Sequence, residues 1–317
     1  MTTGAIRRIA LIGVGIMGSG MAAEWAAAGH AVTIYARDEE RLARGQERVA
    51  AALRTLGGAG LLDAGGAETA LARVGTTTDL QQSVAGADLV QESIPENLDL
   101  KRELFTKLDS WCPPETILAT NTSGLPITQI AEGLAGARRI IGVHYLNPAY
   151  LMPPVEVIPG EATAPEVVER MRAALIALGK SPLVVRREVP GFLWNRLQFA
   201  LVREAFWLVQ EGVATMEEVD LAIRQGLGRR WATAGPFALD GPGRTRHLQQ
   251  RRELPLPPPQ QRRHRARFPP RADRGGLLRR EERQRLLRLA RRQARGNRRP
   301  PQRRAARRPA RRPGRES

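Results

Sequence analysis

Short apolar runs alternate with longer amphipathic segments along the first 190 residues of the chain. The apolar runs predict strands over residues 6–12, 31–36, 88–94, 116–121, 140–146, 155–158 and 183–187. Segments with apolar residues at helical spacing predict helices over residues 16–28, 39–56, 98–112, 127–134 and 164–178. Alternating strands and helices pack into a parallel sheet with helices on both faces. The pattern therefore predicts an α/β fold with a Rossmann-type, doubly wound, mostly parallel sheet.

The pattern becomes helical only from residue 191 onward. Residues 192–210 carry apolar side chains at helical spacing, and residues 216–225 form a further expected helix. We therefore expect an α/β domain over residues 1–189. The start of a helical domain for substrate binding or dimerisation is expected over residues 190–243.

Composition changes abruptly after residue 243. Residues 1–243 hold 23 basic and 27 acidic side chains, whereas residues 244–317 hold 27 arginines, no lysine and 5 acidic side chains. The net charge of +18 therefore comes from the tail. The tail also carries ten prolines and too few apolar residues to offset chain entropy. We expect it to be disordered, with a short helix near residues 280–293.

Three interpretations of this tail remain open. It is a natural disordered segment, an arm that binds nucleic acid non-specifically through phosphates, or the product of a reading-frame slip in GC-rich DNA. The frame slip is favoured because Arg, Pro, Ala and Gly have GC-rich codons and Lys, which the tail lacks, does not. In every case we expect the tail to take no part in the chemistry of residues 1–243.

A glycine-rich turn joins the first expected strand to the first expected helix. Its sequence is Gly13-Val14-Gly15-Ile16-Met17-Gly18. Gly13 permits the tight turn, Gly15 lets a pyrophosphate approach the backbone, and Gly18 lets the helix pack closely. The free N–H groups at the helix start, around Ile16 and Met17, favour phosphate. The strand-turn-helix context predicts a dinucleotide site; a glycine-rich turn without a ligand is the alternative.

The end of the second expected strand bears on which dinucleotide binds. An acidic residue normally stands there and binds the adenosine ribose. Here Ala36 takes that position and Arg37 follows it. We expect NAD as the cofactor, with Asp38 available to the ribose, and NADP as the alternative, with Arg37 meeting the 2′-phosphate.

Only two histidines, His30 and His144, lie within residues 1–243. His144 stands at the end of an apolar run, and Asn121 and Ser123 end another in the same way. Ligands in open α/β sheets bind beyond the carboxyl ends of strands. His144 is either a structural histidine or the proton acceptor of an enzyme, since histidine is the usual general base and His144 is the one histidine placed at a strand end.

The ordered motifs resemble those of the 3-hydroxyacyl-CoA dehydrogenase family. They are Gly13-x-Gly15-x-x-Gly18, Glu96-Asn97-Leu98-x-x-Lys101, Asn121-Thr122-Ser123, His144-Tyr145-x-Asn147-Pro148, Val155-Glu156-Val157 and Pro190-Gly191-Phe192-x-x-Asn195-Arg196. The segments 147–153, 195–200 and 225–231 are more similar to the lambda-crystallin/L-gulonate 3-dehydrogenase branch. The resemblance covers about residues 6–243 and leaves out the tail.

The resemblance implies a catalytic set of four residues. His144 would take the proton of the substrate hydroxyl, and Glu156 would orient His144 and stabilise its cation. Ser123 and Asn195 would hydrogen-bond the substrate oxygen and the histidine region. Three alternatives stay open: Ser123 as a helix cap, Asn195 as a solvated helix residue, and Glu156 as a surface charge on an edge strand.

The resemblance also adds to the cofactor site. Glu96 and Lys101 match positions near the nicotinamide ribose, and Asn121 joins them as a cofactor-binding residue. For Glu96 and Lys101 the alternative is a pair of surface charges at a helix start. No metal is expected.

The implied activity is that of an NAD(P)-dependent oxidoreductase that interconverts a 3-hydroxyacyl-CoA and the 3-oxoacyl-CoA. The alternatives are a dehydrogenase of a free 3-hydroxy acid such as L-gulonate, and a non-catalytic protein, crystallin-like or associated with nucleic acid. Recognition of CoA would rest on Arg41, Arg44 and Arg48. A homodimer is expected if the helical domain is complete.

The remaining expectations concern the compartment. No run of about 18 apolar residues marks a membrane span. A single cysteine, Cys112, excludes an internal disulfide and suits a reducing compartment. We therefore expect a cytoplasmic protein that does not bind membranes.

Overall fold

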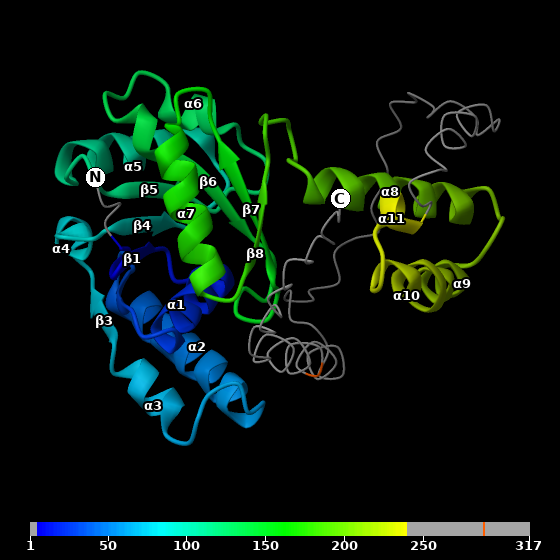
Figure 1. The fold of residues 1–317 in the computed structure, drawn as a ribbon, viewed down its shortest axis with the longest axis horizontal. Coiled ribbons are helices and arrows are strands. Elements are labelled where there is room, and N and C mark those ends of the chain that lie inside the picture. Colours follow the sequence, from blue (N-terminus) through cyan, green and yellow to red (C-terminus); the bar gives the residue numbers. More distant parts are fainter. Residues whose placement is uncertain (1–4, 240–287, 289–317) are drawn as a thin grey trace, which may run out of the picture. The chain divides into compact units, whose positions relative to one another are not determined.

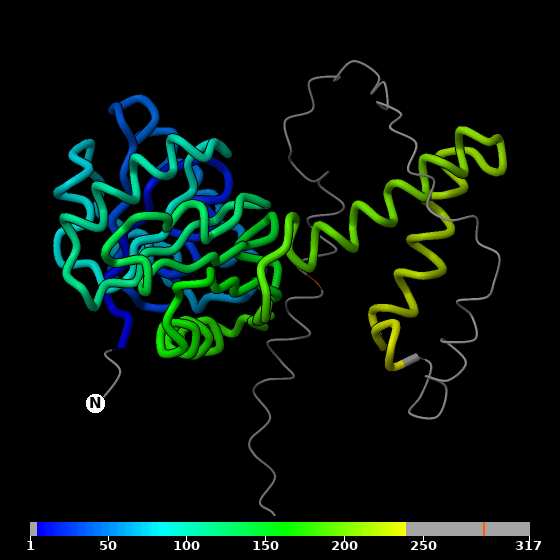
Figure 2. Tube along the Cα trace, turned by 90° about the horizontal axis from the view of Figure 1, so that it is seen from above, coloured from blue at the N-terminus to red at the C-terminus, as the bar shows by residue number. Residues whose placement is uncertain are grey.

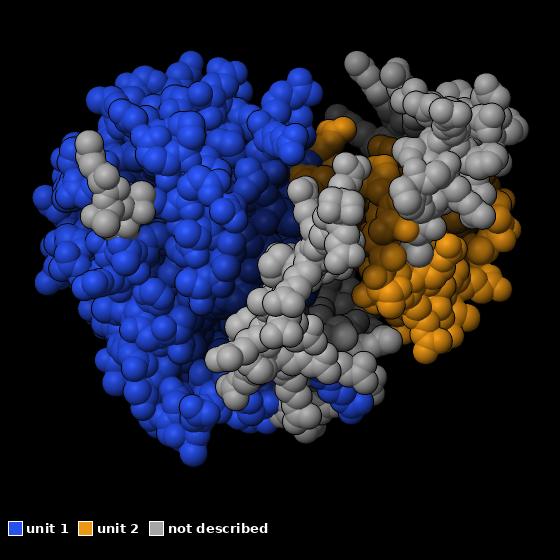
Figure 3. All heavy atoms as spheres, viewed as in Figure 1, with its two compact units in different colours: residues 1–192, 278–317 blue, residues 193–277 orange. Residues whose placement is uncertain are grey.

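The computed structural model describes residues 5–239 and Arg288 (Figure 1). These residues divide into two compact units between Phe192 and Leu193, close to the expected boundary at residue 190 (Figure 3). Apart from Arg288, the arginine-rich tail over 244–317 and its expected helix at 280–293 lie outside the described residues.

Eight strands form a single sheet in the first unit. They are β1 (Arg8–Ile12), β2 (Ala31–Tyr35), β3 (Val74–Thr77), β4 (Leu89–Glu92), β5 (Ile117–Thr120), β6 (Ile140–Tyr145), β7 (Pro154–Pro159) and β8 (Ser181–Val184). Their order is β3-β2-β1-β4-β5-β6-β7-β8, and every neighbouring pair is parallel except β6 and β7. The expected Rossmann-type, doubly wound, mostly parallel sheet is confirmed.

Helices cover both faces of this sheet (Figure 1). They are α1 (Ile16–Ala27), α2 (Glu39–Gly58), α3 (Gly66–Leu71), α4 (Leu80–Val84), α5 (Leu98–Trp111), α6 (Ile127–Ala131) and α7 (Pro165–Ala177), with a short 3-10 turn at Ala137–Arg139. One core lies between the sheet and α1, α2, α3 and α7. A second core lies between the opposite face and α4, α5 and α6.

Two parts of the sheet differ from the pattern-based expectation. No element was expected between residues 59 and 87, where β3 lies; β3 reads Val-Gly-Thr-Thr and has no buried residue, so it gives no apolar run. β8 begins at Ser181, earlier than the expected strand at 183–187. Pro182 argues against an interior strand, but β8 is an edge strand, where a missing N–H costs nothing.

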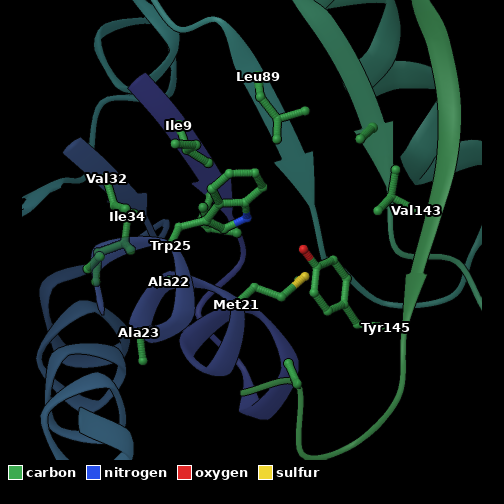
Figure 4. Packing of buried hydrophobic residues seen from close by; sticks show 14 of the residues in the cluster. Ile9, Met21, Ala22, Ala23, Trp25, Val32, Ile34, Leu89, Val143 and Tyr145 are labelled. Atoms are coloured by element: carbon green, nitrogen blue, oxygen red, sulfur yellow. The ribbon is translucent and has the colours of Figure 1, made fainter. Parts of the chain in front are cut away.

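A buried ammonium group anchors the loop that follows β6. Lys180 is 8% exposed. Its Nζ donates to the carbonyls of Ala149 at 2.6 Å and Met152 at 2.8 Å, and lies 2.5 Å from Oε1 of Glu24. Figure 4 shows the core between the sheet and α1, where the Tyr145 ring lies beside Met21 and near Trp25. Loop 146–153 is therefore fixed from the α1 side of the sheet.

The second unit is helical. It contains α8 (Trp194–Gln210), α9 (Met216–Leu221), a π-helix (Ala222–Leu227), α10 (Gly228–Trp231) and α11 (Pro236–Leu239). Figure 2 shows α8 and the segment from α9 to α10 as two arms joined by a turn. The expected helix at 192–210 begins later, because Phe192 has φ 48°, which helical backbone cannot adopt. No helix among residues 5–239 is both long and apolar enough to cross a membrane.

The buried Glu24 predicts a pH dependence of stability. Burial raises the pKa of Glu24 to about 7, against the opposing charge of Lys180. Between its ordinary pKa of 4.5 and about 7, the folded chain keeps a proton that the unfolded chain has lost. The contribution of Glu24 to the free energy of unfolding is therefore fully present below pH 4.5 and is lost as the pH rises to about 7. The free energy of unfolding should fall by at most ~1.4 kcal/mol per pH unit in this range.

Urea unfolding between pH 5 and pH 8 checks this dependence. Glu24→Gln, which cannot titrate, should flatten the decline in the free energy of unfolding. Glu47→Gln, at an exposed position of α2, should leave the decline unchanged. Parallel curves for the parent and Glu24→Gln would contradict the assignment.

Candidate active site

The glycine-rich turn between β1 and α1 has two glycines that the fold requires and one that it does not. A Cβ on Gly13, which has φ 95°, would lie 2.5 Å from the Ser93 carbonyl oxygen. A Cβ on Gly18 would lie 1.8 Å from the Gly13 carbonyl oxygen. A Cβ on Gly15 would have no atom within 4 Å, and Gly15 has φ −66°, which any residue can adopt. The packing therefore leaves Gly15 free to face a ligand.

A cleft of about 760 Å³ opens over this turn at the carboxyl ends of β1, β2 and β4. Six of the expected cofactor residues line it: Gly13, Gly15, Ile16, Met17, Ala36 and Arg37. Gly18 lies beneath the turn instead, against Gly13. Arg41, Arg44 and Arg48 of α2 line the same cleft. The arginines considered for CoA thus face the dinucleotide side.

The start of α1 suits a pyrophosphate. Its N-cap residue, Gly15, supplies no side-chain cap, and the first turn holds no acidic residue. The first N–H groups of α1 therefore keep their hydrogen-bonding capacity and a positive dipole end for an anion. Together with the open space at Gly15, this arrangement fits the expected dinucleotide.

His144 and Glu156 form a buried pair at the same edge of the sheet. They stand opposite each other in the antiparallel register of β6 and β7. Their side chains are 6% and 2% exposed, and Nδ1 of His144 lies 2.7 Å from Oε2 of Glu156. Glu156 is not a surface charge on an edge strand, because β8 flanks β7 and the side chain is buried.

The Phe192 ring lies against the histidine, with ring centroids 6.0 Å apart. Phe192 is 1% exposed and packs in the core on the α5 side. The sequence pattern placed Phe192 inside a helix and missed this contact. The preceding Pro190-Gly191 was the available signal for a turn at this point.

Glu96 organises the turn after β5. Its Oε1 accepts from Oγ1 of Thr122 at 2.6 Å and from the N–H groups of Ser123 at 2.9 Å and Gly124 at 3.2 Å. Two expected site residues, Glu96 and Ser123, are thus brought together. Neither lines the cleft over the glycine-rich turn.

Lys101 is buried rather than a surface charge, being 1% exposed. Its Nζ lies 2.5 Å from Oε1 of Glu92 and 3.7 Å from Oε2 of Glu96. Glu92 is fully buried and also accepts from Oγ1 of Thr120 at 2.6 Å. Glu92 was not among the expected site residues; its position at the end of an apolar strand, nine residues before Lys101, was the available signal.

Asn121 and Asn195 have different surroundings. Oδ1 of Asn121 accepts from the N–H of Tyr145 at 2.8 Å, which ties the end of β5 to the residue after His144. Asn121 does not line the cleft. Asn195 lies in the first turn of α8, in the second unit.

A Rossmann sheet with an open glycine-rich turn at the start of its first helix is the arrangement of a dinucleotide-binding domain. Residues 8–189 match the family model of the 3-hydroxyacyl-CoA dehydrogenase NAD-binding domain. Residues 191–284 match the C-terminal domain model of the same family, beyond residue 243, where the resemblance was expected to end. The chain belongs to the 3-hydroxyacyl-CoA dehydrogenase family, and its cofactor is NAD.

Individual relatives agree with this assignment. The chain is 42% identical over 239 residues to L-carnitine dehydrogenase of Streptomyces griseus subsp. griseus, covering 74% of this chain and 70% of the relative. It is 35% identical over 238 residues to lambda-crystallin of Oryctolagus cuniculus, covering 75% of each. The solved structure of 5-formyl-3-hydroxy-2-methylpyridine 4-carboxylic acid 5-dehydrogenase, an NAD⁺-dependent dismutase, has a TM-score of 0.71 at 38% identity, covering 78% of this chain and 80% of that chain.

Substitutions of Gly15 and Gly18 should have different effects, one on cofactor affinity and the other on stability. Gly15→Val should fold like the parent, since the position is open and its φ suits valine, but its side chain would occupy the path of the pyrophosphate. Affinity for NADH should fall at least about tenfold. Gly18→Ala should instead lower the free energy of unfolding, because its Cβ meets the Gly13 carbonyl.

Urea unfolding and NADH fluorescence titration separate the two effects. Unchanged NADH affinity in a folded Gly15→Val protein would remove the cofactor from this turn. An unaltered stability of Gly18→Ala would contradict the packing described for the turn.

Proposed function

We propose that this chain is an NAD-dependent dehydrogenase that oxidises the secondary alcohol at C3 of a carboxylic acid or its thioester, with His144 as the proton acceptor. The observation that carries the proposal is the buried pair of His144 and Glu156, 2.7 Å apart, at the same sheet edge as the glycine-rich turn. A structural protein with this fold would not need a buried imidazole and carboxylate there.

Glu156 gives His144 its direction. With its proton on Nδ1, His144 donates a hydrogen bond to the Glu156 carboxylate, so Nε2 keeps a lone pair with which to accept the proton of a substrate hydroxyl. When Nε2 gains that proton, the buried Glu156 carboxylate stabilises the imidazolium. Phe192 packs against the ring and limits its rotation.

The nicotinamide ring supplies the acceptor for the hydride that leaves C3. In this proposal Ser123 hydrogen-bonds the substrate oxygen. Glu96 fixes the turn that carries Ser123. Lys101 and Asn121 support the nicotinamide side of the site: Lys101 through its pair with Glu92, and Asn121 through its bond to Tyr145.

A free 3-hydroxy acid is the favoured substrate class. Arg41, Arg44 and Arg48, the residues considered for CoA, line the cleft over the glycine-rich turn, where the dinucleotide is expected instead. Two of the relatives described above act, by their names, on L-carnitine and on a pyridine carboxylate, neither of which is a CoA thioester. The 3-hydroxyacyl-CoA substrate remains the second candidate, because the family model carries that activity in its description.

Loss of the proton acceptor should remove turnover without removing the cofactor. His144→Gln should lower kcat by about 10²–10⁴-fold and leave NADH affinity unchanged. His30→Gln is the matched control, since His30 packs edge-on against Trp25 at 4.9 Å and has no part in the site. Steady-state kinetics of the full chain check both. Activity of His144→Gln within a few-fold of the parent would exclude His144 as the acceptor.

The substrate class can be tested with 3-hydroxybutyrate and its CoA thioester, which share the same acyl group, and with L-carnitine as a second free 3-hydroxy acid. We expect kcat/KM for 3-hydroxybutyrate or L-carnitine to exceed that for 3-hydroxybutyryl-CoA by at least about tenfold. The assay is NADH formation by the full chain at saturating NAD. A higher kcat/KM for the thioester would reverse the preference, and oxidation of none of the three would contradict the proposed substrate class.

A further inference from the structure

We propose that the cofactor cleft contains a binding site for the 2′-phosphate of NADP(H), built from Arg37 with Arg48, so that the chain accepts NADP(H) in addition to NAD(H). The proposal rests on the dinucleotide site described above and is independent of the substrate. It concerns the adenosine end of the cleft, where β2 meets α2.

The position that would select NAD lacks a carboxylate. An acidic side chain at the end of β2 hydrogen-bonds the ribose hydroxyls of NAD and repels a 2′-phosphate. Ala36 occupies that position, lines the cleft and is 5% exposed. Nothing at this position opposes an extra phosphate.

The nearest carboxylate, Asp38, is already engaged. Asp38 is the N-cap of α2, where its Oδ1 accepts from the N–H of Arg41 at 2.9 Å. Its Oδ2 forms an ion pair with the guanidinium of Arg41. These bonds, above all the one from the Arg41 N–H, lower the pKa of Asp38 and hold its charge at the helix start. Serving the ribose would cost α2 its cap.

Arginines, in contrast, face the cleft along one side of α2. Arg41, Arg44 and Arg48 are spaced so that they share one helical face, and all three line the cleft together with Arg37. This face of α2 packs against the glycine-rich turn, since a Cβ on Gly45 would lie 2.5 Å from Cβ of Val14. The arginines are therefore held next to the turn that receives the pyrophosphate.

Two of the four arginines form no direct ion pair among the described residues, although the charge of Arg37 also contributes to lowering the pKa of Asp38. Arg41 pairs with Asp38, and Arg44 pairs with Glu40. Within residues 5–239, neither Arg37 nor Arg48 has a carboxylate within ion-pair distance. Nη1 of Arg48 donates to the Val14 carbonyl at 3.3 Å, which places its guanidinium at the turn. A phosphate monoester, with a charge near −2 and three acceptor oxygens, is the group that such guanidinium pairs bind best.

Adenosine 2′,5′-bisphosphate and 5′-AMP test the site without substrate and without turnover, because they differ only in the 2′-phosphate. Isothermal titration of the full chain should give a dissociation constant for the bisphosphate at least about tenfold lower than for 5′-AMP. The preference should shrink as salt rises, since the guanidinium groups are exposed. NADPH and NADH titrations should follow the same order.

Arg37→Ala should remove most of this preference and leave the affinity for 5′-AMP unchanged. Arg54→Ala is the matched control, because Arg54 is exposed on the same helix and does not line the cleft. The control also accounts for attraction to the arginine-rich tail, which all three proteins share. Ala36→Asp should reverse the preference toward 5′-AMP. Because Ala36 is buried, a charged side chain there can disturb folding, so Arg37→Ala is the deciding variant.

Equal affinities for the two nucleotides in the parent would overturn the proposal. So would an equal loss of both affinities in Arg37→Ala, or the same loss of preference in Arg54→Ala. Failure of both nucleotides and of NADH to bind would overturn the dinucleotide site itself. Normal nucleotide binding without oxidation of any 3-hydroxy acid would leave the 2′-phosphate site standing and contradict only the proposed function.

Discussion

The antiparallel register between β6 and β7 is the constraint on which the proposed chemistry depends. It sets His144 directly opposite Glu156, on the face of the sheet that also carries Ile158 in the α5-side core. A slip of one residue would turn Glu156 to the other face and leave a buried imidazole without its carboxylate. Two interactions oppose such a slip. Asn121 binds the N–H of Tyr145, and Lys180 holds the carbonyls of loop 146–153 between the two strands.

The reversal of direction at β7 also explains how the site is assembled. In the parallel part of the sheet, the carboxyl ends of β1, β2, β4 and β5 meet at one edge, and ligands bind there. β7 runs the other way, so the start of β7, with Glu156, reaches the same edge as the end of β6. One antiparallel pair thus brings the Glu156 carboxylate, which we propose orients His144, to the edge where the glycine-rich turn lies.

The sequence predicted those parts whose cause is local. The apolar run before Gly13 and the glycine spacing dictate strand, turn and helix within a few residues, so the predicted bounds of β1 and α1 lie within two residues of the observed ones. The partnership of His144 and Glu156 came from family motifs, and the structure adds the strand register that makes it possible. The short β3 was missed because an exposed edge strand needs no apolar run.

The rest depends on partners distant in the chain. Glu92 is buried beside Lys101 of α5, which forms an ion pair with it, and the strand sequence alone gives no sign of that neighbour. The sequence left Asp38 available to the ribose, whereas in the structure its carboxylate caps α2 by accepting from the N–H of Arg41. The left-handed backbone of Phe192 makes α8 begin later than the spacing of apolar residues indicates, since this spacing carries no information on φ.

A crystal structure of the full chain with NADH tests the central arrangement most directly. The pyrophosphate should lie over Gly15 at the start of α1. The nicotinamide ring should extend toward the edge where β5 and β6 end, so that its C4 and Nε2 of His144 face one shared space large enough for a carbon–oxygen bond. A dinucleotide bound elsewhere, or a nicotinamide ring that points away from His144, would contradict the joint action of the glycine-rich turn and the histidine-carboxylate pair.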